Sequence, residues 1–246
     1  MSIDLNADLG EGMDDALVLP FLTSASVACG MHAGSPLTMA RTVALALARG
    51  VRVGAHPGYA DRENFGRTAM QLPLEEVRAL LLYQIAALDG FVRAQGGRLA
   101  HVKAHGALYN QAAREMPLAR AVAEAVRVYR SDLLLIGLAG SAQIEAARSL
   151  GLPAAGEAFA DRRYLADGSL MPRSRPGAVL HEPAEAAEQA VLIAREGVAV
   201  ADDGSRVRID AQTICLHGDT PGAERIARAV RERLEAEGVT VAPMGG

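Results

Sequence analysis

The chain has 246 residues, half of them hydrophobic and 4% aromatic with no Trp, which suits one domain with a large aliphatic core. Its formal net charge of −4 argues against a nucleic-acid partner, since proteins that bind nucleic acids normally present a basic face. No apolar run is long enough to span a bilayer and the N-terminus lacks a secretory signal, so we expect no membrane partner and a cytoplasmic location.

Short apolar segments alternate with amphipathic segments along the whole chain. Strands are predicted at Ile3–Leu9, Ser26–Cys29, Arg52–Ala55, Ala100–Ala104, Leu133–Leu138, Ala154–Ala158, Thr213–Leu216 and, at the end, Val239–Ala242. Helices are predicted at 36–49, 74–95, 117–129, 141–150, 183–196 and 222–237. This order predicts parallel βαβ units in a single domain over 1–246, interrupted by a hairpin turn at Asp203-Gly204.

The strands alternate between an apolar and a polar face. In the first strand, Ile3, Leu5, Ala7 and Leu9 lie opposite Asp4, Asn6 and Asp8; in the fourth, Val102 and Ala104 lie opposite His101, Lys103 and His105. An open sheet with helices on both sides needs two apolar faces, whereas a closed barrel has helices outside only. We therefore predict an α/β fold, an irregular TIM-like barrel of about seven parallel strands.

Four of the six histidines fall at or just after predicted strand ends, where barrel enzymes hold their active sites: His32, His56, His105 and His217. Any one of them alone fits a hydrogen-bonded residue at the root of a loop equally well. Four on one rim favour a functional site. Carboxylates follow the same strand ends: Asp8, Glu11, Glu157, Asp161 and Asp219.

Lys103 is predicted to point into the barrel, where a buried ammonium needs an anionic partner. We weigh two roles equally: an ion pair with Asp4, Asp8 or Glu157, and a catalytic role. The histidines and carboxylates permit a bound divalent metal such as zinc or manganese, but neither H-E-x-x-H nor C-x-x-C occurs, so the metal stays open and no ligands are assigned. The sequence also lacks the G-x-S-x-G nucleophile turn and the G-x-x-x-x-G-K-[ST] phosphate loop.

Several motifs together resemble one family along nearly the whole chain. They are DLNADLGEG at 4–12, ACGMHAGSP at 28–36, GAHPG at 54–58 with FGR at 65–67, HVKAHGALYN at 101–110, EAFADRRY at 157–164 and HGDTPGA at 217–223. They look like the signatures of the LamB/YcsF family, the A subunit of bacterial ATP-dependent 5-oxoprolinase. Met31 and Ala104 depart from the family pattern without removing a chemical group.

The resemblance implies a barrel related to the polysaccharide deacetylases of the glycoside hydrolase/deacetylase superfamily. It also implies that the lactam ring of 5-oxo-L-proline is opened to L-glutamate, coupled to hydrolysis of ATP with magnesium, together with partner subunits B and C. The catalytic candidates are Asp8, His56, Lys103, His105 and Glu157. The substrate-binding candidates are Asn6, His32, Arg67, Asp161, Arg162, His217 and Asp219.

Two other functions stay open at this point. One is a stand-alone metal-dependent deacetylase or hydrolase, which would hold a metal tightly and need no ATP. The other is a non-catalytic subunit that binds a small carboxylate. Activity measured with and without partner subunits and ATP separates all three.

Overall fold

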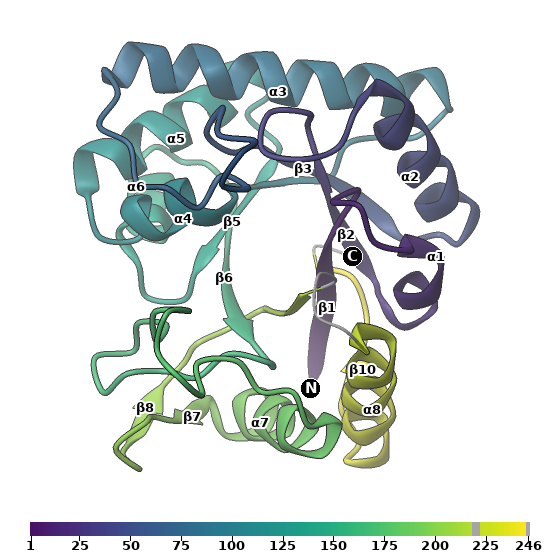
Figure 1. Ribbon diagram of the computed structural model, residues 1–246, viewed down its shortest axis with the longest axis vertical. Helices are drawn as coiled ribbons and strands as arrows, with labels where there is room; N and C mark the ends of the chain where they lie inside the picture. Colours follow the sequence, from purple (N-terminus) through teal and green to yellow (C-terminus); the bar gives the residue numbers. More distant parts are fainter. Residues whose placement is uncertain (218–221, 245–246) are drawn as a thin grey trace.

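The computed structural model describes residues 1–217 and 222–244. Seven parallel strands close into a barrel in the order β1-β2-β3-β4-β5-β6-β9, with β9 pairing back to β1 (Figure 1). They are β1 Ser2–Leu9, β2 Ser24–Ala28, β3 Arg52–His56, β4 His101–Lys103, β5 Leu134–Leu138, β6 Ala154–Phe159 and β9 Thr213–His217. The predicted barrel of about seven parallel strands is confirmed.

Helices surround the barrel, and each predicted helix is present within about two residues of its expected ends. They are α2 Pro36–Ala48, α3 Leu74–Ala94, α5 Met116–Tyr129, α6 Ala142–Ser149, α7 Pro183–Glu196 and α8 Ala223–Ala236. Ser35 caps the start of α2: its hydroxyl accepts a hydrogen bond from the Thr38 backbone N–H, and Pro36 follows as the first helical residue. Among the described residues, no helix is both long and apolar enough to cross a membrane.

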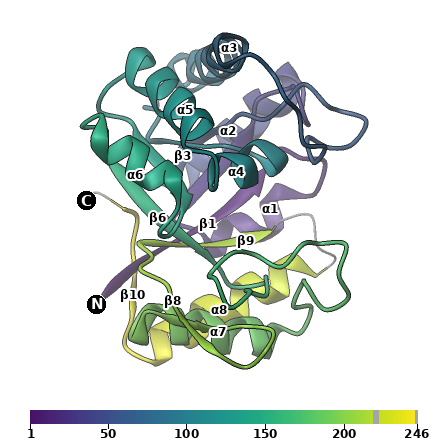
Figure 2. The same ribbon diagram turned by 90° about the vertical axis from the view of Figure 1, so that its left-hand side faces the viewer.

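Three short elements were not predicted: α1 Asp15–Val18, the 3-10 helix η1 Leu19–Phe21 and α4 Gly106–Ala112. The segment predicted to turn at Asp203-Gly204 forms an antiparallel hairpin of β7 Val198–Val200 and β8 Arg206–Arg208, outside the barrel. The last strand, β10 Thr240–Val241, pairs with the first residues of β1. The N-terminus therefore lies at the end of the barrel where the strands begin (Figure 2).

The polar faces of the strands fill the barrel interior, and side chains at the same height come from neighbouring strands. Near the strand starts, Asp4 accepts hydrogen bonds from the hydroxyls of Ser24 (2.6 Å) and Thr213 (2.5 Å). Halfway along the strands, the side chains of Asn6, Lys103 and Glu157 contact one another, and the histidines of the barrel rim lie at the strand ends. The apolar faces pack against the helices instead. The alternation therefore builds a barrel whose centre is polar and almost entirely shielded from water.

Candidate active site

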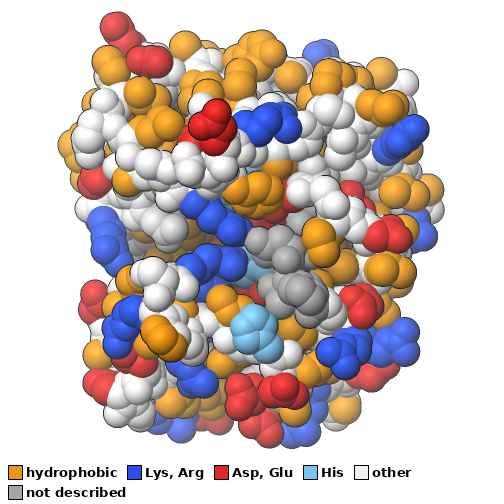
Figure 3. All heavy atoms as spheres, viewed as in Figure 1, with side chains coloured by type: hydrophobic (Ala, Val, Ile, Leu, Met, Phe, Trp, Pro, Cys, Tyr) orange, Lys and Arg blue, Asp and Glu red, His pale blue; other side chains and the backbone are white. Residues whose placement is uncertain are grey.

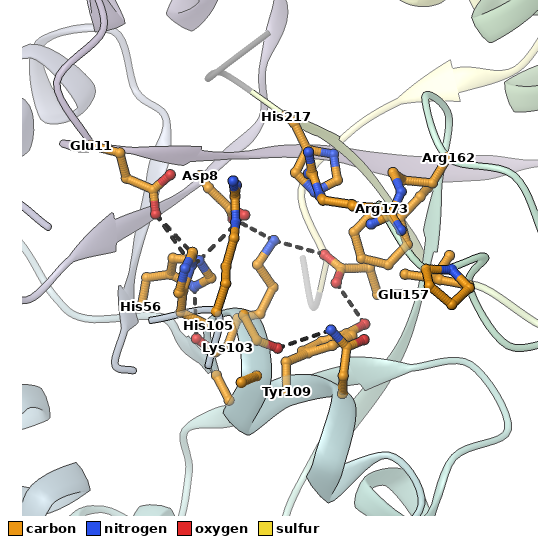
Figure 4. A pocket seen from close by; sticks show the side chains of 18 of the residues that line it. Asp8, Glu11, His56, Lys103, His105, Tyr109, Glu157, Arg162, Arg173 and His217 are labelled. Atoms are coloured by element: carbon orange, nitrogen blue, oxygen red, sulfur yellow. Dashed lines mark hydrogen bonds and ion pairs between the residues drawn. The ribbon is translucent and has the colours of Figure 1, made fainter. Parts of the chain in front are cut away.

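A pocket of about 330 Å³ opens at the carboxyl ends of the strands. This volume suits a small metabolite. In the space-filling view, arginine side chains gather beside the centre of this face, with histidine atoms next to them (Figure 3). Asp8, His56, Lys103, His105 and Glu157, the five predicted catalytic residues, all line the pocket (Figure 4). Of the predicted substrate-binding residues, Arg67, Arg162 and His217 line it too.

Lys103 is the only lysine in the sequence, and it lies at the floor of the pocket with 1% of its surface exposed. Its Nζ lies 2.6 Å from Asp8 Oδ1 and 3.0 Å from Glu157 Oε1, and it also donates to Asn6 Oδ1 at 2.9 Å. Asp8 and Glu157 are two of the three ion-pair partners considered for it. The third, Asp4, lies one layer lower and is held by hydroxyls.

Glu157 is fully buried and both of its carboxylate oxygens are occupied. Oε1 accepts from Asn6 Nδ2 (3.0 Å) as well as from Lys103, while Oε2 accepts from the Tyr109 hydroxyl at 2.8 Å. The second Asn6 N–H goes to the Thr213 hydroxyl at 2.7 Å. Such a fully satisfied buried network is stiff, and it fixes the floor of the pocket.

The charged groups in this network stabilise each other's ionised forms. Burial opposes ionisation of both Asp8 and Lys103, but it is outweighed. His56 and Lys103 hold the pKa of Asp8 well below its usual range, and the charge of Asp8 raises the pKa of Lys103 well above its own. Asp8 is therefore an anion and Lys103 a cation over the neutral pH range.

Three histidines converge beside Asp8 and Glu11. Two of them, His56 and His105, are labelled next to Glu11 in Figure 4. The His56 Nε2 atom lies 2.9 Å from His105 Nδ1 and 3.3 Å from Asp8 Oδ2. His32 stacks on His105 with parallel rings 3.8 Å apart, and its Nε2 lies 2.9 Å from Glu11 Oε1. One oxygen of Glu11 and one nitrogen from each of the three rings lie within 4.8 Å of one another, so these residues could hold a metal.

The electrostatic environment gives the three imidazole rings different pKa values. Burial opposes charge on His56, but the neighbouring Asp8 carboxylate outweighs it and raises the pKa of His56. Burial and the charge of His56 lower the pKa of His32 to about 3, and the same causes lower the pKa of His105. Without another cation, the cluster therefore carries its single positive charge on His56.

Two glycines from the loop after β3 make room for the stacked rings. A side-chain carbon on Gly58 would come within 2.8 Å of His32 Nδ1, and one on Gly66 would come within 2.8 Å of His32 Cβ. Between them, Phe65 adopts a positive φ of 57° and its carbonyl accepts a hydrogen bond from His105 Nε2 at 2.8 Å. Backbone of this kind is costly for an aromatic residue, and here it coincides with an orienting contact to a pocket residue.

His217 and Asp161 form a second imidazole–carboxylate pair. The ring Nδ1 of His217 lies 2.9 and 3.0 Å from the two oxygens of Asp161, and its backbone N–H donates to the same carboxylate at 3.1 Å. Phe159 stacks on the ring at 5.4 Å. Burial opposes ionisation of Asp161, but His217 lowers its pKa overall. Because Nδ1 is engaged, Nε2 is the ring nitrogen left to act in the pocket.

Four arginines line the pocket: Arg67, Arg114, Arg162 and Arg173. The Arg67 guanidinium lies over the Phe65 ring, 4.9 Å from its centroid. Arg162 is buried and donates to the carbonyls of Met171 (2.6 Å) and Ala178 (3.3 Å), while burial and the charge of Arg173 lower its pKa to about 10. This concentration of guanidinium groups suits an anionic ligand.

The remaining predicted residues fall in three places. Asn6 lies beneath the pocket in the Lys103 network, His32 lies behind His105, and Asp161 orients His217. Asp219 lies outside the described residues. The lining residues that were not among the predicted site residues include Glu11, Tyr109, Arg114 and Arg173. Glu11 had been noted as a rim carboxylate, whereas periodicity gives no signal for the others because they lie on α4 or in loops.

Comparisons with known proteins give consistent results. Residues 3–246 match the LamB/YcsF family. A protein from Methylococcus capsulatus, named as the A subunit of 5-oxoprolinase, is 52% identical over 252 residues, covering 100% of this chain and 96% of that protein. The crystal structure of a lactam utilization protein from Thermus thermophilus superposes with a TM-score of 0.93 at 47% identity, covering 98% of this chain and 99% of that one. A T48 deacetylase, with a TM-score of 0.51, 14% identity and coverage of 98% and 87%, shares the fold alone.

Proposed function

The chain belongs to the LamB/YcsF family, and from this membership and its pocket we propose that it opens the lactam ring of 5-oxo-L-proline as one component of an ATP-dependent 5-oxoprolinase. The observation that carries the proposal is the pocket itself. It joins ionised carboxylates, imidazoles and guanidinium groups around a space of about 330 Å³, on a chain that matches a 5-oxoprolinase component from end to end. The product is L-glutamate.

The reaction sets clear demands on such a pocket. Water adds its oxygen to the ring carbonyl carbon, the bond between that carbon and the ring nitrogen breaks, and the nitrogen gains a proton. An unactivated lactam is a poor electrophile, so phosphoryl transfer from ATP to the amide oxygen supplies the driving force. This transfer releases ADP; water then adds to the ring carbon of the phosphorylated lactam, and expulsion of the ring nitrogen, which takes up a proton, leaves an acyl phosphate. A second water hydrolyses the acyl phosphate to glutamate and phosphate. The site needs a base, a proton donor and cations for the anionic groups.

Asp8 is our candidate for the carboxylate that binds and orients the attacking water. It is ionised, it lines the pocket, and it lies beside His56 and His105, which border the same space. Lys103 and Glu157 support it from below. Because Lys103 stays charged, it contributes positive potential to an oxyanion rather than accepting a proton.

His217 is our candidate for the proton donor to the departing nitrogen. Its Nδ1 is fixed by Asp161, and this contact orients the ring so that Nε2 is the nitrogen available in the pocket. Arg67, Arg162 and Arg173 are suited to the substrate carboxylate and to a phosphoryl group, since guanidinium pairs with both.

The whole enzyme uses ATP, with magnesium, as co-substrate, and we propose that subunits B and C are the partners of this chain. A cytoplasmic location follows from the need for ATP. We propose that this chain provides the ring-opening site of the complex. Turnover then requires the partner subunits as well.

Reconstitution tests this function. The purified chain is mixed with subunits B and C, 5-oxoproline and ATP, and glutamate is measured by an enzyme-coupled assay. We expect glutamate only when all three subunits and ATP are present. Rapid ATP-dependent glutamate formation by the chain alone would contradict the partnership. Release of acetate from acetylated sugars without ATP would point to a deacetylase instead.

A further inference from the structure

We propose that Glu11, His32, His56 and His105 form a binding site for one divalent transition-metal ion of the zinc class. The site lies at the wall of the pocket, and three of its members, Glu11, His56 and His105, line that pocket. The proposal goes beyond the lactam chemistry, because the site stands whichever substrate the pocket accepts.

The first argument is the direction of the imidazole lone pairs. His56 Nδ1 lies 2.8 Å from the carbonyl oxygen of Lys103, and His105 Nε2 lies 2.8 Å from the carbonyl oxygen of Phe65. A carbonyl only accepts hydrogen bonds, so both of these nitrogens carry hydrogen. The other two nitrogens, His56 Nε2 and His105 Nδ1, face each other at 2.9 Å. A proton on the charged His56 satisfies this contact in the metal-free cluster, and a metal ion that replaces the proton would take up both lone pairs.

The second argument is the spacing of the four donor atoms. Zinc binds imidazole nitrogen and carboxylate oxygen at about 2.0–2.2 Å, which places tetrahedral ligand atoms roughly 3.4 Å apart. From Glu11 Oε1, the distances are 2.9 Å to His32 Nε2, 3.3 Å to His105 Nδ1 and 3.8 Å to His56 Nε2. All four donor atoms lie within 4.8 Å of one another, a spacing that adjustment of the side chains around one ion can bring to tetrahedral values.

The third argument is the way the rings are held. Histidines that bind metals usually donate their second N–H to a carbonyl or carboxylate, which fixes the ring. His56 and His105 both do so. His32 is held instead by packing, between the His105 ring at 3.8 Å and the backbone of Gly58 and Gly66. Two of the three rings are thus oriented by hydrogen bonds to carbonyls and the third by packing.

The donor set also selects the ion. Three imidazoles and one carboxylate favour zinc, cobalt, nickel or iron over magnesium and calcium, which prefer oxygen ligands. A zinc-class ion at this wall would supply a Lewis acid next to Asp8 and the substrate carbonyl. Magnesium that accompanies ATP belongs to a different kind of site.

The test uses the purified full-length chain without any affinity tag, stripped with a chelator and then dialysed against Zn²⁺. We expect one equivalent of zinc by elemental analysis, a zinc-dependent rise in melting temperature, and no binding of Mg²⁺ at the same concentration. Glu11→Gln and His32→Ala should each weaken zinc binding about a hundredfold or more, since even indirect support of a ligand is worth 10–100-fold.

His181→Ala is the matched control, because His181 is exposed and far from the cluster in sequence; it should bind zinc like the original chain. Should His32→Ala fold poorly, Glu11→Gln keeps the shape of the side chain, and the Co²⁺ absorption spectrum of the original chain reports nitrogen ligation directly. Sub-stoichiometric zinc in the original chain, or unchanged affinity in folded Glu11→Gln, would overturn the site. Neither result depends on 5-oxoproline, so the proposed function stands or falls separately.

Discussion

Replacing Lys103 by Met gives the sharpest structural test of the pocket floor. The change removes a buried cation that lies 2.6 Å from Asp8 Oδ1 and 3.0 Å from Glu157 Oε1. The two carboxylates then share an almost dry interior with no ammonium between them. Breaking a buried ion pair from one side typically costs about 3–5 kcal/mol.

For a domain of this size, each kcal/mol lowers the melting temperature by about 2–4 °C, so Lys103→Met should melt roughly 6–20 °C below the original chain. Thermal unfolding followed by circular dichroism measures the shift. Glutamate formation by the folded fraction, in the complex with its partners, should fall about a hundredfold or more, as expected when a preorganised charge is lost.

A double-variant cycle isolates the ion pair from the loss of packing. Glu157→Gln in the Lys103→Met background removes the surplus negative charge, so the double variant should be about 1–3 kcal/mol more stable than the sum of the single changes predicts. Additive effects, or a Lys103→Met chain that melts like the original, would refute the idea that Lys103 and its carboxylate partners stabilise each other's charged forms.

Three further predictions concern other parts of the pocket. Because Lys103 is the only lysine, selective ¹³Cε labelling gives one side-chain signal, and this signal should not shift between pH 7 and 10; titration in that range would contradict its raised pKa. Asp161 has a lowered pKa, so its stabilising effect is full above the unfolded value of about 3.9 and is lost as the pH falls through the folded value. The stability gap between the original chain and Asp161→Asn should therefore shrink in urea titrations from pH 6 towards pH 3, and a constant gap would argue against the ionised pair. Tyr109→Phe should cost about 1–3 kcal/mol because Glu157 Oε2 loses its donor, whereas exposed Tyr83→Phe should cost almost nothing; equal effects would contradict that contact.

Much of the fold follows from local sequence pattern. Alternation of Asp4, Asn6 and Asp8 with leucine and alanine marks a strand with one polar face and one apolar face, and only a closed barrel accommodates seven such strands with helices outside. Helix starts such as Ser35-Pro36 carry their own signal. By contrast, α4 spans only seven residues directly after β4, too short for a periodic pattern to distinguish it from a loop.

The sequence predicts that the site lies at the rim of the barrel, but it does not predict which side chains contact one another there. Strand register places Lys103 and His105 on the inner face, yet it cannot say that Asp8 and Glu157 would be the partners of Lys103 rather than Asp4. Glu11 and Arg173 reach the pocket from loops whose paths depend on tertiary packing. The convergence of Glu11 with three histidines is likewise a property of the closed barrel, since the four residues span more than 90 positions of sequence.

The central claim is that ring opening takes place in this pocket, and His217→Gln tests it most directly. His217 lies at the pocket edge, partly exposed, so its loss should leave the melting temperature nearly unchanged. General acid catalysis is worth about 10²–10⁴-fold. We expect the complex with partner subunits and ATP to form glutamate at least a hundredfold more slowly with His217→Gln, and at the original rate with His181→Gln. Glutamate formation at the original rate by a folded His217→Gln chain would contradict it.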